Sequence, residues 1–236
     1  MKKNKKNKSN VCCIVAAGGS GTRMGADKNK LLLSLCDIPV IAHTLLKLQK
    51  SEYIGEIIIS AKEEDILEIN DIASVFEITK LKAIVRGGKT RAESILSAIC
   101  EISEDIDFVA VHDGARPLVS EKTIENTVLS AEEFGASACG VKPKCTLKRD
   151  DGNGFIGETV DRDTIYEIQT PQVFKKELFL KAYDTDSEIL EKATDDCSLV
   201  ERLGVKIKIC DGEYSNIKIT TPEDILIAEA ILNEGM

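Results

Sequence analysis

The feature that most constrains the fold is the alternation of short apolar runs with longer amphipathic segments. The apolar runs, each about the length of a buried strand, lie at 11–17, 56–61, 82–86, 107–111 and 136–141. Segments with helical spacing lie between them, at 39–50, at 63–75, from about Lys89 and at 120–134. This alternation predicts an α/β fold with a Rossmann-like, mostly parallel sheet flanked by helices. Ligands of such sheets bind outside the carboxyl ends of the strands.

Residues 142–160 interrupt the alternation. Two strand-like segments, Thr146–Arg149 and Phe155–Val160, flank the turn-rich segment Asp150–Gly154, which predicts a β-hairpin. A two-stranded hairpin is only marginally stable alone. We therefore expect a protruding dimerisation arm at about 142–162 that packs on a second subunit. The alternative is a hairpin folded back onto its own domain.

The C-terminal part returns to the α/β pattern. We expect helices near 175–184 and 195–203, a strand at 205–210 and a final helix from Thr221-Pro222 to about Asn233. The segment Ser215–Thr220 has alternating residues typical of a strand. On a strand, Lys218 would lie on the face opposite Ile217 and Ile219.

Composition limits the classes of protein that fit. The 236 residues, 43% of them hydrophobic, suit a single domain at 11–236 preceded by a disordered, lysine-rich tail at 1–10. The net charge is −9 although this tail carries five lysines, and an acidic body argues against nucleic-acid binding. We expect no second domain, no membrane segment and no signal peptide, and therefore a cytoplasmic protein. Eight cysteines without a C-x-x-C pair predict reduced thiols and no zinc site.

A glycine-rich loop follows the first apolar run. Gly18, Gly19, Gly21 and Gly25 leave backbone N–H groups open to an anion, and Arg23, Lys28 and Lys30 add positive charge. The loop lacks the Gly-Lys-Ser/Thr of a Walker motif, and its glycines do not have the dinucleotide-binding spacing. It therefore predicts a polyphosphate site of another kind, although an ordinary glycine-rich turn has the same local composition.

A second motif, Val109–Pro117, places Asp113 at the carboxyl end of a predicted strand. A carboxylate there suits Mg²⁺, which typically binds one or two carboxylates together with substrate phosphates. The alternative is an aspartate that caps the following turn. For His112 we expect a structural hydrogen bond and no role as a base.

The remaining motifs are weak when each is taken alone. They are Arg86–Ile95, whose Ser94 could face a nucleobase, Thr170–Phe174 with Asp161-Arg162 before it, Thr194–Asp196 and Asn216–Thr220.

Together and in this order, the motifs resemble the 2-C-methyl-D-erythritol 4-phosphate cytidylyltransferase family of the non-mevalonate isoprenoid pathway. The resemblance covers about residues 11–233. Its most specific elements are the glycine loop with Arg23 and Lys30, His112–Pro117, Gly87–Ser94, Thr170–Gln172 and Asn216–Lys218. It implies transfer of CMP from CTP to methylerythritol 4-phosphate, with release of pyrophosphate. It also implies Mg²⁺ as cofactor and a homodimer joined through the hairpin arm.

The resemblance also implies roles for single residues. Arg23 and Lys30 would stabilise the transition state, while Lys218 and Arg162 would position the attacking phosphate, Arg162 in the neighbouring subunit's site. Asp113 would bind the metal. The CTP-binding residues would be Ala16, Ala17, Gly18, Gly21, Gly88, Lys89, Ser94, Asp113 and Gly114. The residues binding the sugar-alcohol phosphate would be Arg116, Thr146, Arg162, Thr170 and Lys218.

Lys89 departs from the family pattern, in which an acidic residue is frequent at this position. The nearest alternative function is a cytidylyltransferase acting on ribitol 5-phosphate, which would share the fold and the glycine loop. A nucleotide-binding regulator without turnover is disfavoured, because it would have no use for transition-state cations. An NAD(P)-dependent oxidoreductase is disfavoured by the long basic loop.

Overall fold

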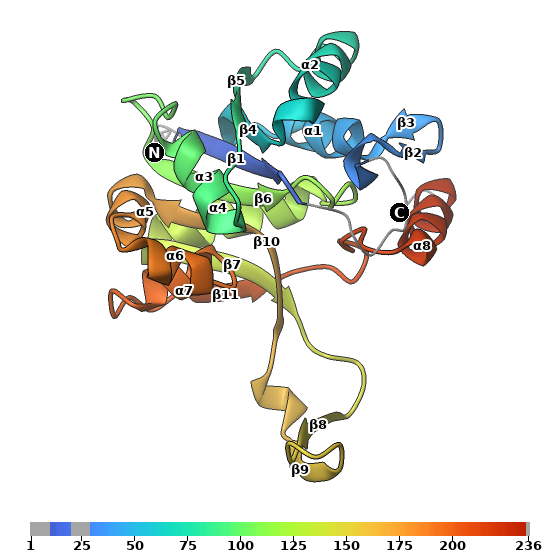
Figure 1. The fold of residues 1–236 in the computed structure, drawn as a ribbon, viewed down its shortest axis with the longest axis vertical. Helices are drawn as coiled ribbons and strands as arrows, with labels where there is room; N and C mark the ends of the chain where they lie inside the picture. Colours follow the sequence, from blue (N-terminus) through green and yellow to red (C-terminus); the bar gives the residue numbers. More distant parts are fainter. Residues whose placement is uncertain (1–9, 20–28, 235–236) are drawn as a thin grey trace, which may run out of the picture.

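The computed structural model describes residues 10–19 and 29–234. A seven-stranded sheet forms the centre of the described part, in the order β11-β7-β10-β6-β1-β4-β5 (Figure 1). Its strands are β1 (Val11–Ala17), β4 (Ile54–Ala61), β5 (Leu81–Arg86), β6 (Phe108–Asp113), β7 (Ala136–Val141), β10 (Glu167–Lys175) and β11 (Lys208–Asp211). All neighbouring pairs are parallel except those of β10, which is antiparallel to β6 and β7. The mostly parallel α/β fold expected from the alternation is confirmed.

Helices cover both faces of the sheet because its central strands are apolar on both sides. Successive residues of β1 point to opposite faces, so that Cys13 and Val15 join one core and Cys12 and Ile14 the other. The first core packs against α1 (Val40–Lys50), α2 (Ile66–Val75), α4 (Glu121–Phe134) and α8 (Pro222–Asn233). The second packs against α3 (Arg91–Ile99), α5 (Lys176–Tyr183), α6 (Ser187–Lys192) and α7 (Asp196–Glu201).

Three local features differ from the sequence-based expectation. Residues 167–175 form β10, a buried antiparallel strand that the polar motif Thr170-Pro171-Gln172 concealed. A short helix, α6, was also missed. The segment 215–220 is not a strand: the side chain of Asn216 binds the Thr170 carbonyl, and this contact replaces a sheet ladder.

The stretch between β1 and α1 is partly ordered. A 3₁₀ turn at Lys30–Leu32 and a small hairpin of β2 (Ser34–Leu35) and β3 (Ile38–Pro39) precede α1. The carboxyl ends of the strands meet beside this stretch, where Ala16 is level with Asp113 on one side and Ser60 on the other. This edge of the sheet is where the sequence predicts ligand binding.

The predicted hairpin is present and extends from the body (Figure 1). It consists of β8 (Leu147–Asp150) and β9 (Ile156–Val160), paired only with each other. Most of its residues are exposed, including the large side chains of Phe155 and Ile156. It contributes nothing to the two cores of its own chain, so the alternative of an arm folded back onto its own domain is not what the structure has.

All eight cysteines are free thiols, and those at 12, 13, 139 and 197 are buried. Burial raises the pKa of Cys139 to about 12 and that of Cys12, Cys13 and Cys197 further still. These thiols therefore act as small apolar groups. Within residues 10–19 and 29–234, the helices are all too short or too polar to cross a membrane.

Candidate active site

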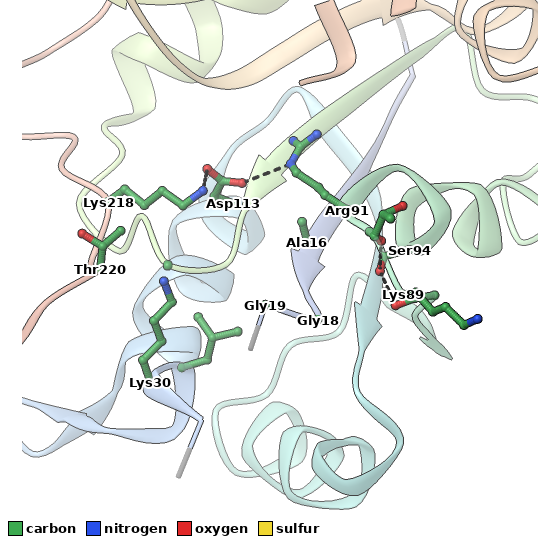
Figure 2. A pocket seen from close by; sticks show the side chains of 14 residues that line it. Ala16, Gly18, Gly19, Lys30, Lys89, Arg91, Ser94, Asp113, Lys218 and Thr220 are labelled. Carbon is green, nitrogen blue, oxygen red and sulfur yellow. Dashed lines mark hydrogen bonds and ion pairs between the residues drawn. The ribbon is translucent and has the colours of Figure 1, made fainter. Parts of the chain in front are cut away.

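A cavity of about 370 Å³ opens at the carboxyl edge of the sheet. Its walls come from the end of β1, the 3₁₀ turn after the glycine loop, the start of α3, the end of β6 and the segment before α8 (Figure 2). The residues that line it are Ala16, Gly18, Gly19, Lys30, Leu31, Gly88, Lys89, Thr90, Arg91, Ser94, Asp113, Ala115, Lys218 and Thr220. The glycine loop, the Asp113 motif and the Lys218 motif therefore meet at one site.

Asp113 is the acidic centre of the cavity. Its carboxylate lies 2.9 Å from Lys218 Nζ, 3.5 Å from Arg116 Nε and 3.7 Å from Arg91 Nε. Burial by itself would raise the pKa of Asp113, but the three cations outweigh burial and hold it well below its usual range. Asp113 is therefore ionised across the physiological pH range.

His112 supports Asp113 from behind the cavity. Its Nδ1 lies 3.0 Å from Thr170 Oγ1, which also accepts a hydrogen bond from the Asp113 backbone N–H. Its Nε2 lies 3.3 Å from the Arg116 carbonyl. Burial lowers the pKa of His112 to about 4, so the ring is neutral near pH 7. The expected structural role of His112 is confirmed.

Lys218 is positioned by a buried anchor two residues before it. Asn216 is fully buried and donates from Nδ2 to the Thr170 carbonyl at 2.9 Å. Its own carbonyl accepts a 2.6 Å hydrogen bond from Arg116 Nη1. These contacts fix an irregular segment against β10 and bring Lys218 to Asp113 (Figure 2).

Lys30 enters the cavity from the 3₁₀ turn. Asn29 caps this turn, accepting from the Leu31 N–H and donating to Asp65 at 2.6 Å. Because Asp65 is buried and ends the 3₁₀ turn Glu63–Asp65 that leads into α2, the turn at Lys30–Leu32 is tied to the body of the domain. Lys30 thus reaches the cavity on the same side as Lys218 and Thr220 (Figure 2).

The opposite wall is the first turn of α3. Thr90 caps this helix by accepting from the Glu93 N–H, and Glu93 in return accepts from the Lys89 N–H at 2.7 Å. A Cβ atom on Gly88 would lie 2.3 Å from the Glu93 Cβ, so only glycine fits. Ser94 donates to the Thr90 carbonyl, while the exposed Lys89 ammonium points away from Asp113 and Lys30 (Figure 2).

The cavity gathers a large part of the predicted site: Ala16, Gly18, Lys30, Gly88, Lys89, Ser94, Asp113 and Lys218. Four other predicted residues lie behind its surface. The Ala17 side chain is in the core, Gly114 packs against Ile41 and β1, and Arg116 and Thr170 stand behind Asp113. Thr146 and Arg162 belong to the arm, and Gly21 and Arg23 fall outside the described residues.

Sequence reasoning missed two charged residues. Arg91 lines the cavity, and its Nη2 lies 2.6 Å from the carboxylate of Asp196, which is fully buried. Both residues lie in motifs that the sequence analysis singled out, but each motif taken alone could be ordinary surface. Only the fold brings the two motifs together.

Comparison with known proteins agrees with this geometry. The sequence profile of the family described as IspD, 2-C-methyl-D-erythritol 4-phosphate cytidylyltransferase, matches residues 11–234. This chain belongs to that family. The family predicted from the motifs is confirmed, and with it the class of nucleotidyltransferase that transfers a cytidylyl group.

Individual relatives show the same similarity. The 2-C-methyl-D-erythritol 4-phosphate cytidylyltransferase of Lysinibacillus sphaericus is 42% identical, over 94% of this chain and 95% of that protein. The enzyme of the same name from Bacillus cereus is 41% identical, over 93% of this chain and 96% of that protein. The crystal structure of 4-diphosphocytidyl-2C-methyl-D-erythritol synthase from Anaerococcus prevotii aligns with a TM-score of 0.83 and 32% identity, covering 96% of this chain and 97% of that one.

Proposed function

We propose that this cavity binds CTP and that its cations catalyse attack by the phosphate of 2-C-methyl-D-erythritol 4-phosphate on the α-phosphorus. The products are 4-diphosphocytidyl-2-C-methyl-D-erythritol and pyrophosphate. The observation that carries the proposal is the meeting of Lys30, Lys218 and Asp113 around one cavity beside the glycine loop. Membership of the cytidylyltransferase family supports the choice of both substrates.

The two walls of the cavity suit the two ends of the nucleotide. The start of α3 offers backbone groups and small side chains at Gly88, Lys89 and Ser94, which suit the cytosine and ribose. Lys30 and Lys218 are on the other side, where the triphosphate and the incoming phosphate would meet. Arg23 would add a further cation from the glycine loop.

Electrostatic stabilisation is the main catalytic device in this scheme. Both reactants are anions, and negative charge gathers on the equatorial oxygens of the α-phosphorus during in-line attack. Positively charged groups fixed beforehand at those oxygens lower the barrier without reorganisation. The attacking phosphate needs no general base, because its second pKa is about 6 and it is largely dianionic near neutral pH.

The cavity also suits one Mg²⁺ ion held jointly by protein and substrate. Among the described residues no cluster of three or more acids, histidines and cysteines could hold a metal by itself. Asp113 offers a hard oxygen donor at the cavity wall, and among the described residues the one contact recorded for its Oδ1 is the long 3.7 Å contact with Arg91. This single carboxylate fits an ion whose other ligands are triphosphate oxygens and water. When bound, the ion would neutralise charge on the phosphates.

The arm supplies the remaining part of the proposed site. Arg162 lies in a 3₁₀ turn at the base of the arm and is exposed, and it is not among the residues that line the cavity of its own chain. We therefore assign Arg162 to the cavity of a second copy, where it would hold the sugar phosphate. This assignment makes the functional unit a homodimer.

A product assay tests the proposal directly. The protein is incubated with CTP, Mg²⁺ and either methylerythritol 4-phosphate or ribitol 5-phosphate, and the cytidine diphosphate product and pyrophosphate are measured. We expect both products with methylerythritol 4-phosphate. Faster turnover of ribitol 5-phosphate would assign the other substrate, and pyrophosphate release that needs neither sugar phosphate would contradict group transfer.

A further inference from the structure

Arg91 is held by Asp196, a residue outside the cavity that is itself bound by Tyr183. Its Nη2 lies 2.6 Å from Asp196 Oδ2, and Asp196 Oδ1 accepts a 2.5 Å hydrogen bond from Tyr183 Oη. Asp196 is fully buried and Tyr183 is nearly so. The three residues come from α3, α7 and the end of α5, which pack together on one face of the sheet.

Asp196 is itself fixed by its surroundings. Asp195 caps α7 and accepts a hydrogen bond from Gln172 Nε2 at 2.9 Å, while the Cys197 N–H donates to Gln172 Oε1. Gln172 is on the buried strand β10, so the first turn of α7 is attached to the sheet on both sides of Asp196. The ring of Tyr183 packs 4.7 Å from that of Phe179, which limits its movement.

The burial of Asp196 requires a cation. An ionised carboxylate in an apolar core is strongly unfavourable unless it is paired. Within the part of the chain that the structure describes, Arg91 is the one cation recorded in an ion pair with Asp196. The same guanidinium presents Nε to Asp113 and lines the cavity. Asp196 therefore fixes how Arg91 faces the site.

We propose that Asp196 is a positioning residue that holds Arg91 as a CTP-binding cation, with Tyr183 as its second support. Arg91 lies one helical turn or less from Lys89 and Ser94, on the wall assigned to the nucleoside, and across the cavity from Lys30 and Lys218 (Figure 2). The effect of Asp196 falls on CTP and not on the sugar phosphate. This inference rests on the proposed placement of CTP in the cavity.

The test compares Asp196→Asn with a matched control. Glu201→Gln removes the same charge from the exposed end of the same helix. CTP binding is measured by calorimetry with Mg²⁺, and KM is measured for each substrate. For Asp196→Asn we expect the Kd and KM of CTP to rise about tenfold, which is the effect of losing one charge-assisted hydrogen bond. The KM of methylerythritol 4-phosphate should stay unchanged. Glu201→Gln should match the wild type in every value.

Combining Asp196→Asn with Arg91→Gln distinguishes a positioning role of Asp196 from a general loss of structure. In Arg91→Gln, adding Asp196→Asn should cause no further rise in the Kd of CTP, because Asp196 acts through Arg91. Tyr183→Phe should keep the fold and raise the Kd of CTP by only about two- to threefold, because the hydrogen bond that it removes is weaker. An unchanged Kd in folded Asp196→Asn, equal rises for both substrates, or additive effects with Arg91→Gln would overturn the proposal. If Asp196→Asn does not fold, Tyr183→Phe takes its place in the test, and an unchanged Kd for CTP in that variant would overturn the proposal.

The calorimetry also separates this inference from the proposed function. Wild-type protein that binds CTP but forms no product would contradict the proposed function alone. Wild-type binding and turnover together with wild-type affinity in Asp196→Asn would contradict this inference alone.

Discussion

The floor of the cavity, formed by Asp113, Arg116 and Lys218, and the arm both carry close ion pairs, yet the two regions differ in what those pairs can do. At the floor, Lys218 lies 2.9 Å from Asp113, and their side chains are 40% and 9% exposed. On the arm, Arg149 lies 2.6 Å from Glu158, but their side chains are 69% and 61% exposed. Water and salt screen an exposed pair, so the shorter contact is the weaker one. Burial, more than distance, decides which charges are fixed in place.

The same contrast applies to packing. The floor is supported by hydrogen bonds from His112, Thr170 and Asn216 and by two apolar cores. The arm has no core, and Phe155 and Ile156 are exposed. A preorganised floor suits transition-state stabilisation, whereas a bare arm suits contact with another subunit.

Lys30→Ala should lower kcat by about a hundredfold or more, the size seen when one preorganised charge or donor is removed from a transition state. CTP binding should weaken much less, because the contact strengthens as charge develops. Steady-state kinetics and a CTP titration check this. An equal loss in kcat and in CTP affinity would make Lys30 an ordinary binding residue.

Stability of the floor should depend on pH through His112. Its pKa is about 4 in the folded protein, so the unfolded chain takes up the proton first as pH falls below the ordinary value of about 6.5. The free energy of unfolding should therefore drop by about 2 kcal/mol between about pH 7.5 and about pH 5 from this group. Urea unfolding at both pH values measures the drop. His112→Asn should show a drop smaller by that amount, and an equal drop would contradict the account.

Arg162→Ala should raise the KM of methylerythritol 4-phosphate by about tenfold, the loss of one charge-assisted contact. The free energy of unfolding should stay within about 0.5 kcal/mol of the wild type, because the residue is exposed. Kinetics and urea unfolding check both values. A rise confined to the KM of CTP would place Arg162 elsewhere in the site.

The pair on the arm should contribute least. A double-mutant cycle of Arg149→Ala and Glu158→Ala should give a coupling below about 1 kcal/mol, with turnover unchanged. Urea unfolding of the four proteins measures it. A coupling as large as that of a buried pair would show that exposure is not what separates the two regions.

The sequence predicts most of the parallel strands well because they are short apolar runs, and β1, β5 and β6 lead into glycines or end in an acid. It predicts β10 poorly because Gln169, Thr170 and Gln172 are polar. Their burial makes sense only once they bind Asn216, Asp113 and the start of α7. Residues 215–220 mislead in the opposite way, since their alternation imitates a strand that does not form.

The residues of the candidate site also differ in how well the sequence predicts them. Lys30 follows the glycine loop and Asp113 ends a recognisable strand, whereas Lys218 is marked only by the family motif Asn216–Lys218. The pairing of Arg91 with Asp196 depends on how α3 and α7 pack, and local sequence carries no signal of that contact. The role proposed for Arg162 depends on a second copy of the chain.

We propose that each active site combines the fixed floor of one chain with the arm of another. A mixed dimer of Lys30→Ala and Arg162→Ala subunits tests it most directly, because one of the two sites in each mixed dimer then has both residues. With methylerythritol 4-phosphate well below its KM, where Arg162→Ala alone is about tenfold slower than the wild type, co-refolding equal amounts should restore about a quarter of wild-type turnover, since half of the dimers are mixed and one of the two sites in each is complete. Turnover that stays at the level of the two separate variants would contradict the claim.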